Sequence, residues 1–283
     1  MPSAAERVLG SLLRRVSIDR FELAADHDET YFQDGFADTQ RYQQRFDGHL
    51  SVAGRSVLDV GCGYGSSCFE FARQGAKRVL GIDIDAKFVA FAQDRLAREP
   101  RLADRLEFRH VDAQGADLGE TFDLAISKDS FEHIADPEHY LAALKRYVGP
   151  GGEIAIGFGP LWRSPYGAHQ LQMSRLPWAH LIFPERVVMR EWRRIGFPGG
   201  ATTYAEIAGG LNKMTLGRFE RVLEDPELER VFFATNQTTA RSGRLLKTLA
   251  RLPGAREACT FNVYALSRYR PRSDGGVPPR SRP

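Results

Sequence analysis

The fold is decided by the stretch Val57-Leu58-Asp59-Val60-Gly61-Cys62-Gly63-Tyr64-Gly65. Its first four residues are typical of a buried strand, and the glycines that follow indicate a tight turn before a helix. Glycine lets backbone amides approach a ligand closely, because no Cβ stands in the way. In a doubly wound sheet such a turn lies at the carboxyl end of the first strand, where ligands bind. The stretch therefore predicts a parallel α/β sheet with a binding loop.

Outward from this stretch, short apolar runs alternate with helical patterns, as they do in βαβ units. This rhythm predicts a Rossmann-like α/β fold: a doubly wound, mostly parallel, seven-stranded sheet with helices on both faces. The parallel strands are predicted at residues 56–60, 78–82, 106–111, 122–127 and 153–158, with helices at 67–74, 86–97 and 137–148. A helix at 215–223, a strand at 230–235, a helix at 243–252 and a strand at 261–267 complete the fold.

Three segments surround the sheet. Residues 5–21 place apolar side chains at helical spacing and a polar-aromatic stretch follows, so residues 1–50 are predicted to form a helical lid. Within the main domain, residues 51–267, the segment 159–212 holds all three tryptophans without strand periodicity and predicts a substrate cap inserted after the fifth strand. Residues 268–283 hold five arginines against one aspartate and are predicted to be a disordered basic tail.

The composition excludes several classes of protein. With 42% hydrophobic and 27% charged residues the chain is typical of a globular protein, and outside the tail its charge is close to neutral, so no nucleic-acid partner is expected. Its three cysteines are too few and too scattered for a disulfide framework. No run approaches the roughly 20 apolar residues that span a bilayer, and the N-terminus lacks a signal-peptide core. We expect a cytoplasmic protein, with its oligomeric state left open and a membrane-surface or partner role for residues 5–21 as an alternative.

Carboxylates accompany the first three strands. Asp83 ends the second strand 22 residues after Gly61, where an acidic side chain can accept both hydroxyls of a ribose. Asp112 follows the third strand and can accept from the amino group of adenine, while Ala113 leaves room for the ring. Because parallel strands end at the same edge of a sheet, Asp59, Asp83 and Asp112 are expected to lie close together.

A dinucleotide site is the rival interpretation, since it also uses glycines at this turn. Its G-x-G-x-x-G/A pattern requires glycine or alanine where this chain has Ser66. Asp59 discriminates more sharply, because a carboxylate two residues before the first glycine would repel a pyrophosphate but pair with an ammonium group. The electrostatics therefore favour a cationic ligand over NAD.

Five motifs follow one another along residues 55–158: residues 58–63, Gly81-Ile82-Asp83, Asp112-Ala113, residues 122–127 and Glu132-His133. Together they resemble the successive motifs of class I S-adenosylmethionine-dependent methyltransferases, and most of all the type 11 subgroup that contains the ubiquinone and menaquinone methyltransferases. The resemblance implies S-adenosyl-L-methionine as the cofactor. It implies a methionine moiety held by Asp59, Gly61, Cys62 and Gly63, a ribose at Asp83 beside Ile84, adenine at Asp112 and Ala113, and a pocket floor lined by Ser127 and Lys128.

Methyl transfer is an in-line displacement that depends mainly on alignment, so a general base is optional. The candidate bases near the end of the fourth strand are Lys128, Asp129, Glu132 and His133. We favour His133, because imidazole titrates near neutrality; the alternative is a histidine that bonds the backbone or shapes the pocket wall. Glu132 is expected to be solvated or to cap a helix.

The cap supplies further candidates. His169 is the second candidate catalytic residue, and Tyr166, Trp178 and His180 are predicted to line a largely apolar acceptor pocket. The alternative is that these aromatic side chains only hold a long loop to the surface. No grouping of histidine, aspartate and glutamate has metal-ligand spacing, so no metal is expected.

These observations predict an enzyme that methylates a small organic molecule at oxygen, nitrogen or carbon. Three alternatives stay open. They are a methyltransferase-fold protein that has lost catalysis and acts as a binding or regulatory subunit, an NAD-dependent oxidoreductase, and an enzyme acting on protein or RNA through the arginine-rich tail.

Overall fold

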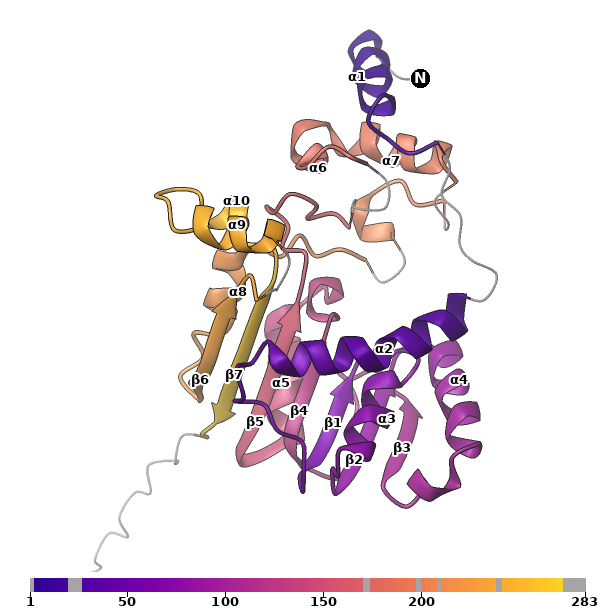
Figure 1. Ribbon diagram of the computed structural model, residues 1–283, viewed down its shortest axis with the longest axis vertical. Helices are drawn as coiled ribbons and strands as arrows, with labels where there is room; N and C mark the ends of the chain where they lie inside the picture. Colours follow the sequence, from indigo (N-terminus) through magenta and orange to yellow (C-terminus); the bar gives the residue numbers. More distant parts are fainter. Residues whose placement is uncertain are drawn as a thin grey trace, which may run out of the picture.

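The computed structural model describes residues 3–19, 27–169, 174–196, 200–207, 210–237 and 241–271. Its centre is a seven-stranded sheet in the order β3-β2-β1-β4-β5-β7-β6 (Figure 1). β7 pairs antiparallel with both β5 and β6, whereas the first five strands pair in parallel, so the predicted mostly parallel sheet is confirmed. The strands are β1 (Ser56–Val60), β2 (Arg78–Asp83), β3 (Leu106–His110), β4 (Phe122–Lys128), β5 (Val148–Phe158), β6 (Leu228–Thr235) and β7 (Val263–Tyr269).

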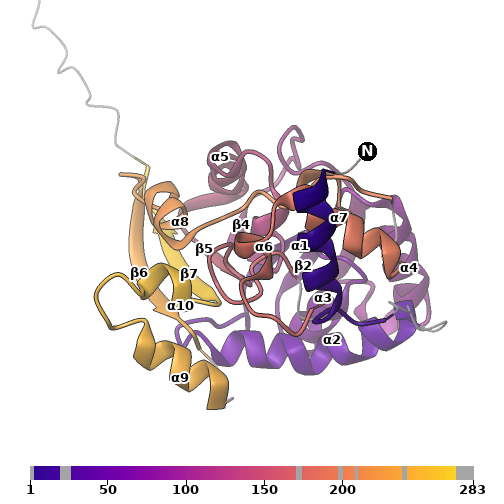
Figure 2. The ribbon, with the colours of Figure 1, turned by 90° about the horizontal axis from the view of Figure 1, so that it is seen from above.

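Helices cover both faces of the sheet, and each face has its own hydrophobic core. Figure 2, seen from above, places α2 and α3 on one side of the strands and α5 and α8 on the other. The first face is covered by α2 (His27–Gln44), α3 (Ser66–Arg73) and α4 (Ala86–Ala97), and the second by α5 (Pro137–Tyr147) and α8 (Leu216–Val222). α9 (Arg241–Leu249) and α10 (Arg256–Cys259) connect β6 to β7.

Side-chain caps set the starts of three of these helices. The Asp85 carboxylate accepts from the amide of Lys87 at the start of α4, and Asp136 does the same for α5, with a proline in the first turn. The Thr215 hydroxyl caps α8. These local signals explain why the helices begin within one or two residues of their predicted positions.

The ends of several elements differ from the prediction. β5 begins at Val148 instead of 153, because Val148 still pairs with Phe122 across an irregularity in the register. β7 continues to Tyr269, and the guanidinium of Arg268 pairs with Glu153, so the first residues of the predicted basic tail belong to the sheet. The rest of that tail, from residue 272, lies outside the described residues.

The two helices within residues 1–50 have separate places. α2 packs on α3, and its Phe32 and Tyr42 are buried in the core of the sheet. α1 (Ala4–Arg14), shorter than the predicted helix, packs instead on α7 (Glu185–Arg194), where Leu13 is buried and Glu6 pairs with Arg190. α1 therefore packs on the inserted segment, whereas α2 packs on the sheet domain.

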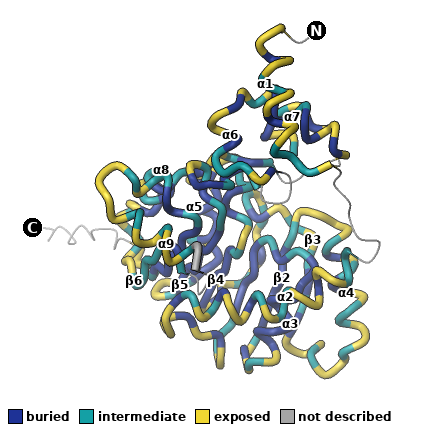
Figure 3. The backbone as a smooth tube through the Cα atoms, turned by 45° about the horizontal axis from the view of Figure 1, so that its top comes forward, coloured by how far each residue is buried: buried dark blue, intermediate teal, exposed yellow. Residues whose placement is uncertain are grey.

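The insert has a hydrophobic core of its own. Together with α1, the segments around α6 (Ala179–Ile182) and α7 form a cap lobe beyond the carboxyl ends of β4 and β5 (Figure 1). Figure 3 shows buried backbone around α7 as well as through the sheet. The lobe is centred on Val187, Val188 and Trp192 of α7. Among the helices in the described ranges, none is both long and apolar enough to cross a membrane.

Candidate active site

A pocket of about 650 Å³ opens at the carboxyl ends of β1, β2, β3 and β4. It lies where the strand order reverses between β1 and β4, which is the ligand position of doubly wound sheets. Of the predicted cofactor residues, all but Ser127 line it: Asp59, Gly61, Cys62, Gly63, Asp83, Ile84, Asp112, Ala113 and Lys128. The fold thus brings these residues from four strand ends to one cavity.

Ser127 lies behind the pocket wall. The residue is fully buried, and its hydroxyl accepts a hydrogen bond from Tyr140 at 3.1 Å. Tyr140 itself lines the pocket in that place. The tyrosine was not recognised in the sequence, because a helical residue twelve positions beyond the end of β4 carries no local mark of a pocket.

The glycine loop is held over the end of β2. The amides of Gly61 and Cys62 both donate to the carbonyl of Ile82, at 2.9 and 3.1 Å, and the amide of Gly63 donates to the Asp83 carboxylate at 2.8 Å. The second carboxylate oxygen of Asp83 accepts from the amide of Asp85 at 2.9 Å. Asp83 therefore orders the loop as well as facing the pocket.

Asp59 is the most buried of the three carboxylates. It is 2% exposed, and the Cys68 thiol donates to it across 3.3 Å. Burial disfavours the charged form and raises the pKa of Asp59 to about 6. A cationic group entering the pocket would favour the ionised form.

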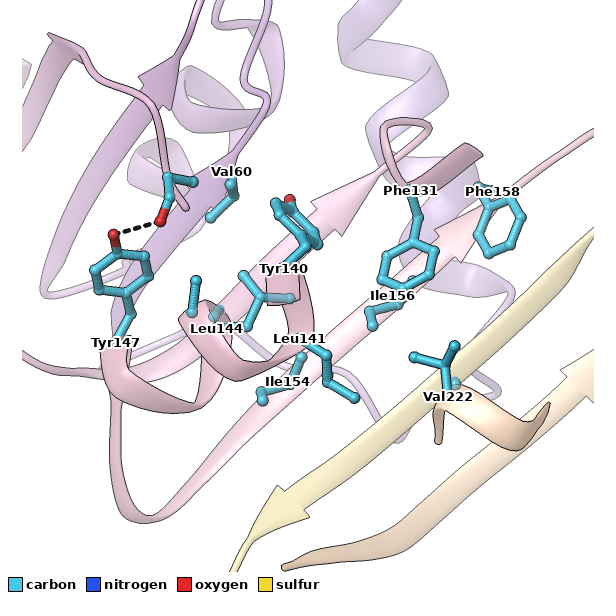
Figure 4. Close-up of a cluster of buried hydrophobic side chains, with 14 of the residues drawn as sticks. Val60, Phe131, Tyr140, Leu141, Leu144, Tyr147, Ile154, Ile156, Phe158 and Val222 are labelled. Carbon is cyan, nitrogen blue, oxygen red and sulfur yellow. Dashed lines mark hydrogen bonds between the residues drawn. The ribbon is translucent and has the colours of Figure 1, made fainter. Parts of the chain in front are cut away.

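The loop of Asp112 and Ala113 is held from beneath. The Asp112 carboxylate accepts from the amide of Gln114 at 2.9 Å. The hydroxyl of Tyr147, on α5, donates to the carbonyl of Ala113 at 2.6 Å (Figure 4). Because both hydrogen bonds form within the protein and need no ligand, they hold this wall of the pocket in place before a ligand binds.

α2, which lies within the predicted helical lid, contributes residues to the pocket that the sequence analysis did not name. Tyr31 and Gly35 line the wall, and the Asp38 carboxylate lies 2.7 Å from the ammonium of Lys128. Burial lowers the pKa of Lys128, but the carboxylates of Asp129 and Asp38 outweigh that effect and raise it above its usual value. The only hint in the sequence was the polar-aromatic composition of this stretch.

The short helix η2 (Phe131–His133) follows β4 and reaches the pocket. His133 lines it, and its Nδ1 lies 2.6 Å from the carbonyl oxygen of Gly210. Glu132 was expected to be solvated or to cap a helix, and the first of these expectations is wrong, because the residue is 4% exposed. Burial lowers the pKa of His133 and raises the pKa of Glu132 well above its usual value.

The cap residues that were predicted to act on the acceptor divide into two groups. His169 lies against His133, with ring centroids 5.3 Å apart, and burial lowers the pKa of His169 to about 4. Trp178 and His180 instead make contacts inside the cap lobe. The Trp178 indole donates to the carbonyl of Arg163, and Nε2 of His180 lies 2.5 Å from the carbonyl oxygen of Trp162. Tyr166, half-buried in the same loop, does not line the pocket either.

Comparison with known proteins is consistent with this geometry. Residues 58–156 match the family described as "Methyltransferase domain". The mitochondrial ubiquinone biosynthesis O-methyltransferase of Schizosaccharomyces pombe is 32% identical over 37% of this chain and 38% of its own length. The 27-O-demethylrifamycin SV methyltransferase of Amycolatopsis mediterranei is 34% identical over 46% of this chain and 48% of its own. The matched stretch thus spans less than half of these relatives.

Solved structures share the fold over most of the chain. A geranyl diphosphate C-methyltransferase from Streptomyces coelicolor A3(2) superposes with a TM-score of 0.54 at 15% identity, covering 95% of this chain and 100% of that one. An S-adenosylmethionine dependent methyltransferase from Mesorhizobium loti gives a TM-score of 0.54 at 18% identity, covering 83% and 99%. Residues 58–156 thus match a methyltransferase domain, and the chain as a whole has the Rossmann-like fold that these solved methyltransferases share, with a pocket at the switch point of its sheet.

Proposed function

We propose that this chain transfers the methyl group of S-adenosylmethionine to a small organic acceptor. The observation that carries the proposal is the single pocket that joins the glycine loop to Asp59, Asp83 and Asp112 on one side and to His133 on the other. The matched relatives are named for ubiquinone biosynthesis, for a rifamycin derivative and, in Triticum aestivum, for phosphoethanolamine, which supports a small acceptor.

The roles follow from charge and position. Asp59 would pair with the ammonium of the methionine moiety, Asp83 would accept from the ribose hydroxyls, and Asp112 would accept from the adenine amino group. S-adenosylmethionine supplies the methyl group for an in-line displacement, for which the acceptor atom must lie about 3–3.5 Å from the methyl carbon. We place the acceptor beside His133 and His169. Roles for Tyr166, Trp178 and His180 stay predictions.

The test is transfer itself. The chain is incubated with S-adenosylmethionine labelled in its methyl group and with a panel of phenols, catechols, amines and acidic ketones, and labelled product is followed together with S-adenosylhomocysteine. We expect transfer to at least one class of acceptor. Tight binding of the methyl donor without transfer to any of them would favour a binding or regulatory protein instead. Binding of NAD in its place would point to an oxidoreductase.

Binding of S-adenosylmethionine is expected to weaken as the pH falls through about 6. The ammonium of the ligand pairs with the ionised form of Asp59, whose pKa of about 6 in the free protein makes it protonated below that pH. If only the ionised form binds, affinity at pH 5 is about tenfold lower than at pH 8. Calorimetry across this range measures the change. In Asp59→Asn binding should be weaker throughout and nearly independent of pH; a variant that keeps the wild-type profile would exclude Asp59 as its source.

Gly61→Ala is expected to weaken binding of the methyl donor about tenfold. Gly61 has a φ of 78°, which costs an alanine about 1–2 kcal/mol, and a Cβ there would lie 2.4 Å from the hydroxyl oxygen of Ser130. The matched control is Gly115→Ala, because a Cβ at Gly115 meets no atom within 4 Å. Calorimetry with S-adenosylmethionine compares the two. Equal affinities would show that the loop tolerates the added methyl group.

A further inference from the structure

Three side chains that can bind metal converge at the edge of the pocket. Glu132 and His133 belong to η2, and His169 comes from the cap, 36 residues further along the chain. One ligand atom from each lies within 4.8 Å of the other two. Because His133 also lines the pocket, this cluster borders the place that we assign to the acceptor.

Two of the three side chains present buried atoms without a partner. Within the described part of the chain, neither Oε2 of Glu132 nor Nε2 of His169 has a hydrogen-bond partner. An unpaired polar group costs free energy when it is buried, and a charged one costs more unless a cation pairs with it. Lys128 is close in sequence, but its ammonium already contacts the carboxylates of Asp38 and Asp129. The Glu132 carboxylate is therefore suited to an added cation.

The hydrogen bond of His133 leaves its other ring nitrogen ready to bind a metal. A carbonyl oxygen can only accept, so the bond from Nδ1 to the carbonyl of Gly210 requires the proton on Nδ1 and leaves a lone pair on Nε2. Histidines that bind metals usually donate their second nitrogen to a carbonyl or carboxylate in this way. The contact has the form expected of a group that orients a ligand.

The backbone around these ligands is also held in place. The side-chain amide of Asn212 donates to the carbonyls of Phe131 and Ile134, at 2.8 and 2.7 Å, and its backbone amide donates to the carbonyl of Glu132 at 2.9 Å. The segment that carries Gly210 and Asn212 thus clamps η2 on both sides of its ligands.

We propose that Glu132, His133 and His169 bind a divalent first-row transition-metal ion. Two imidazoles and one carboxylate suit ions such as Zn²⁺ or Fe²⁺ and do not suit Mg²⁺, which prefers oxygen ligands. Bonds of about 2.0–2.2 Å place tetrahedral ligand atoms about 3.5 Å apart, so ligand atoms that lie up to 4.8 Å apart would close by at most about 1.3 Å on binding. Three protein ligands leave at least one position open. In a step that rests on the proposed function, an oxygen atom of the acceptor takes that position.

The site is tested by metal binding, without turnover. Protein stripped with a chelator is titrated with Zn²⁺ by calorimetry and with Co²⁺ by visible absorption, whose d–d bands report the coordination geometry of the bound ion. We expect one ion per chain. Glu132→Gln and His169→Asn should each weaken binding on the order of 100-fold. Asparagine is chosen because it tolerates the positive φ of 58° at His169.

The matched control is His139→Gln, which removes an exposed histidine of α5 and should leave metal affinity unchanged. Each variant is also titrated with S-adenosylmethionine, so that a misfolded protein is recognised because it binds neither the metal nor S-adenosylmethionine. If Glu132→Gln misfolds, Glu132→Asp replaces it. Wild-type protein that binds no ion stoichiometrically, or His169→Asn that binds as tightly as wild type, would overturn the proposal. Metal binding without methyl transfer would leave the site in place and overturn the proposed function alone.

Discussion

Asp83→Ala is expected to weaken binding of S-adenosylmethionine by at least about 100-fold. A hydrogen bond to a charged acceptor contributes about 1.5–3 kcal/mol, and in the proposed binding mode the substitution removes the two that the ribose hydroxyls would donate to Asp83. Since about 1.4 kcal/mol corresponds to a factor of ten, the loss reaches two orders of magnitude or more. The alanine also releases the amide of Gly63, which donates to the Asp83 carboxylate, so the glycine loop loses order. Calorimetry with the methyl donor measures the combined effect.

The control for this variant is Asp94→Ala. Asp94 lies on α4 with its side chain 58% exposed, and it pairs with Arg98, the C-cap residue of that helix. A surface pair of this kind contributes little, so binding should equal that of wild type. Affinity of Asp83→Ala within threefold of wild type would show that Asp83 does not hold the ligand and would remove the main support for the cofactor site.

Phe131→Ala is expected to lower the free energy of unfolding by about 3–5 kcal/mol, which is the range for a fully buried phenylalanine. The ring is 0% exposed and packs between Phe158, Phe219 and Tyr140, with centroids 5.3–5.7 Å away. Figure 4 shows Phe131 between Tyr140 and Phe158. It also anchors η2, so the variant should lose the placement of Glu132 and His133. Urea unfolding followed by tryptophan fluorescence gives the change in stability.

Two further variants define the origin of that loss. Phe131→Leu retains most of the apolar volume and should cost less than about 1.5 kcal/mol. Leu245→Ala, at a position that is 60% exposed on α9, should stay within about 0.5 kcal/mol of wild type. Suppose that Phe131→Ala and Leu245→Ala had the same free energy of unfolding. The aromatic cluster around Phe131 would then not stabilise the part of the fold that carries η2.

The parts of the site that could be predicted are those that lie next to a strand end. Gly61, Asp83 and Asp112 each stand within a few residues of a strand, and parallel strands bring their carboxyl ends to one edge. Once the strands are recognised, the place of these residues follows from strand geometry alone. The boundary of β5 was harder to predict, because its pairing runs back through a register irregularity near Phe122.

The sequence by itself determined the sheet, the binding loop and the carboxylates that face it, because each depends on a periodicity or on a neighbour close along the chain. Only the tertiary structure decided that α2 reaches the pocket through Tyr31, that Tyr166 and Trp178 stay in the cap, and that His169 meets Glu132 and His133. These contacts join segments separated by tens of residues. They form through packing of α2 on α3, through packing of the cap and through the bond from His133 to Gly210, and none of these leaves a periodic signal in the sequence.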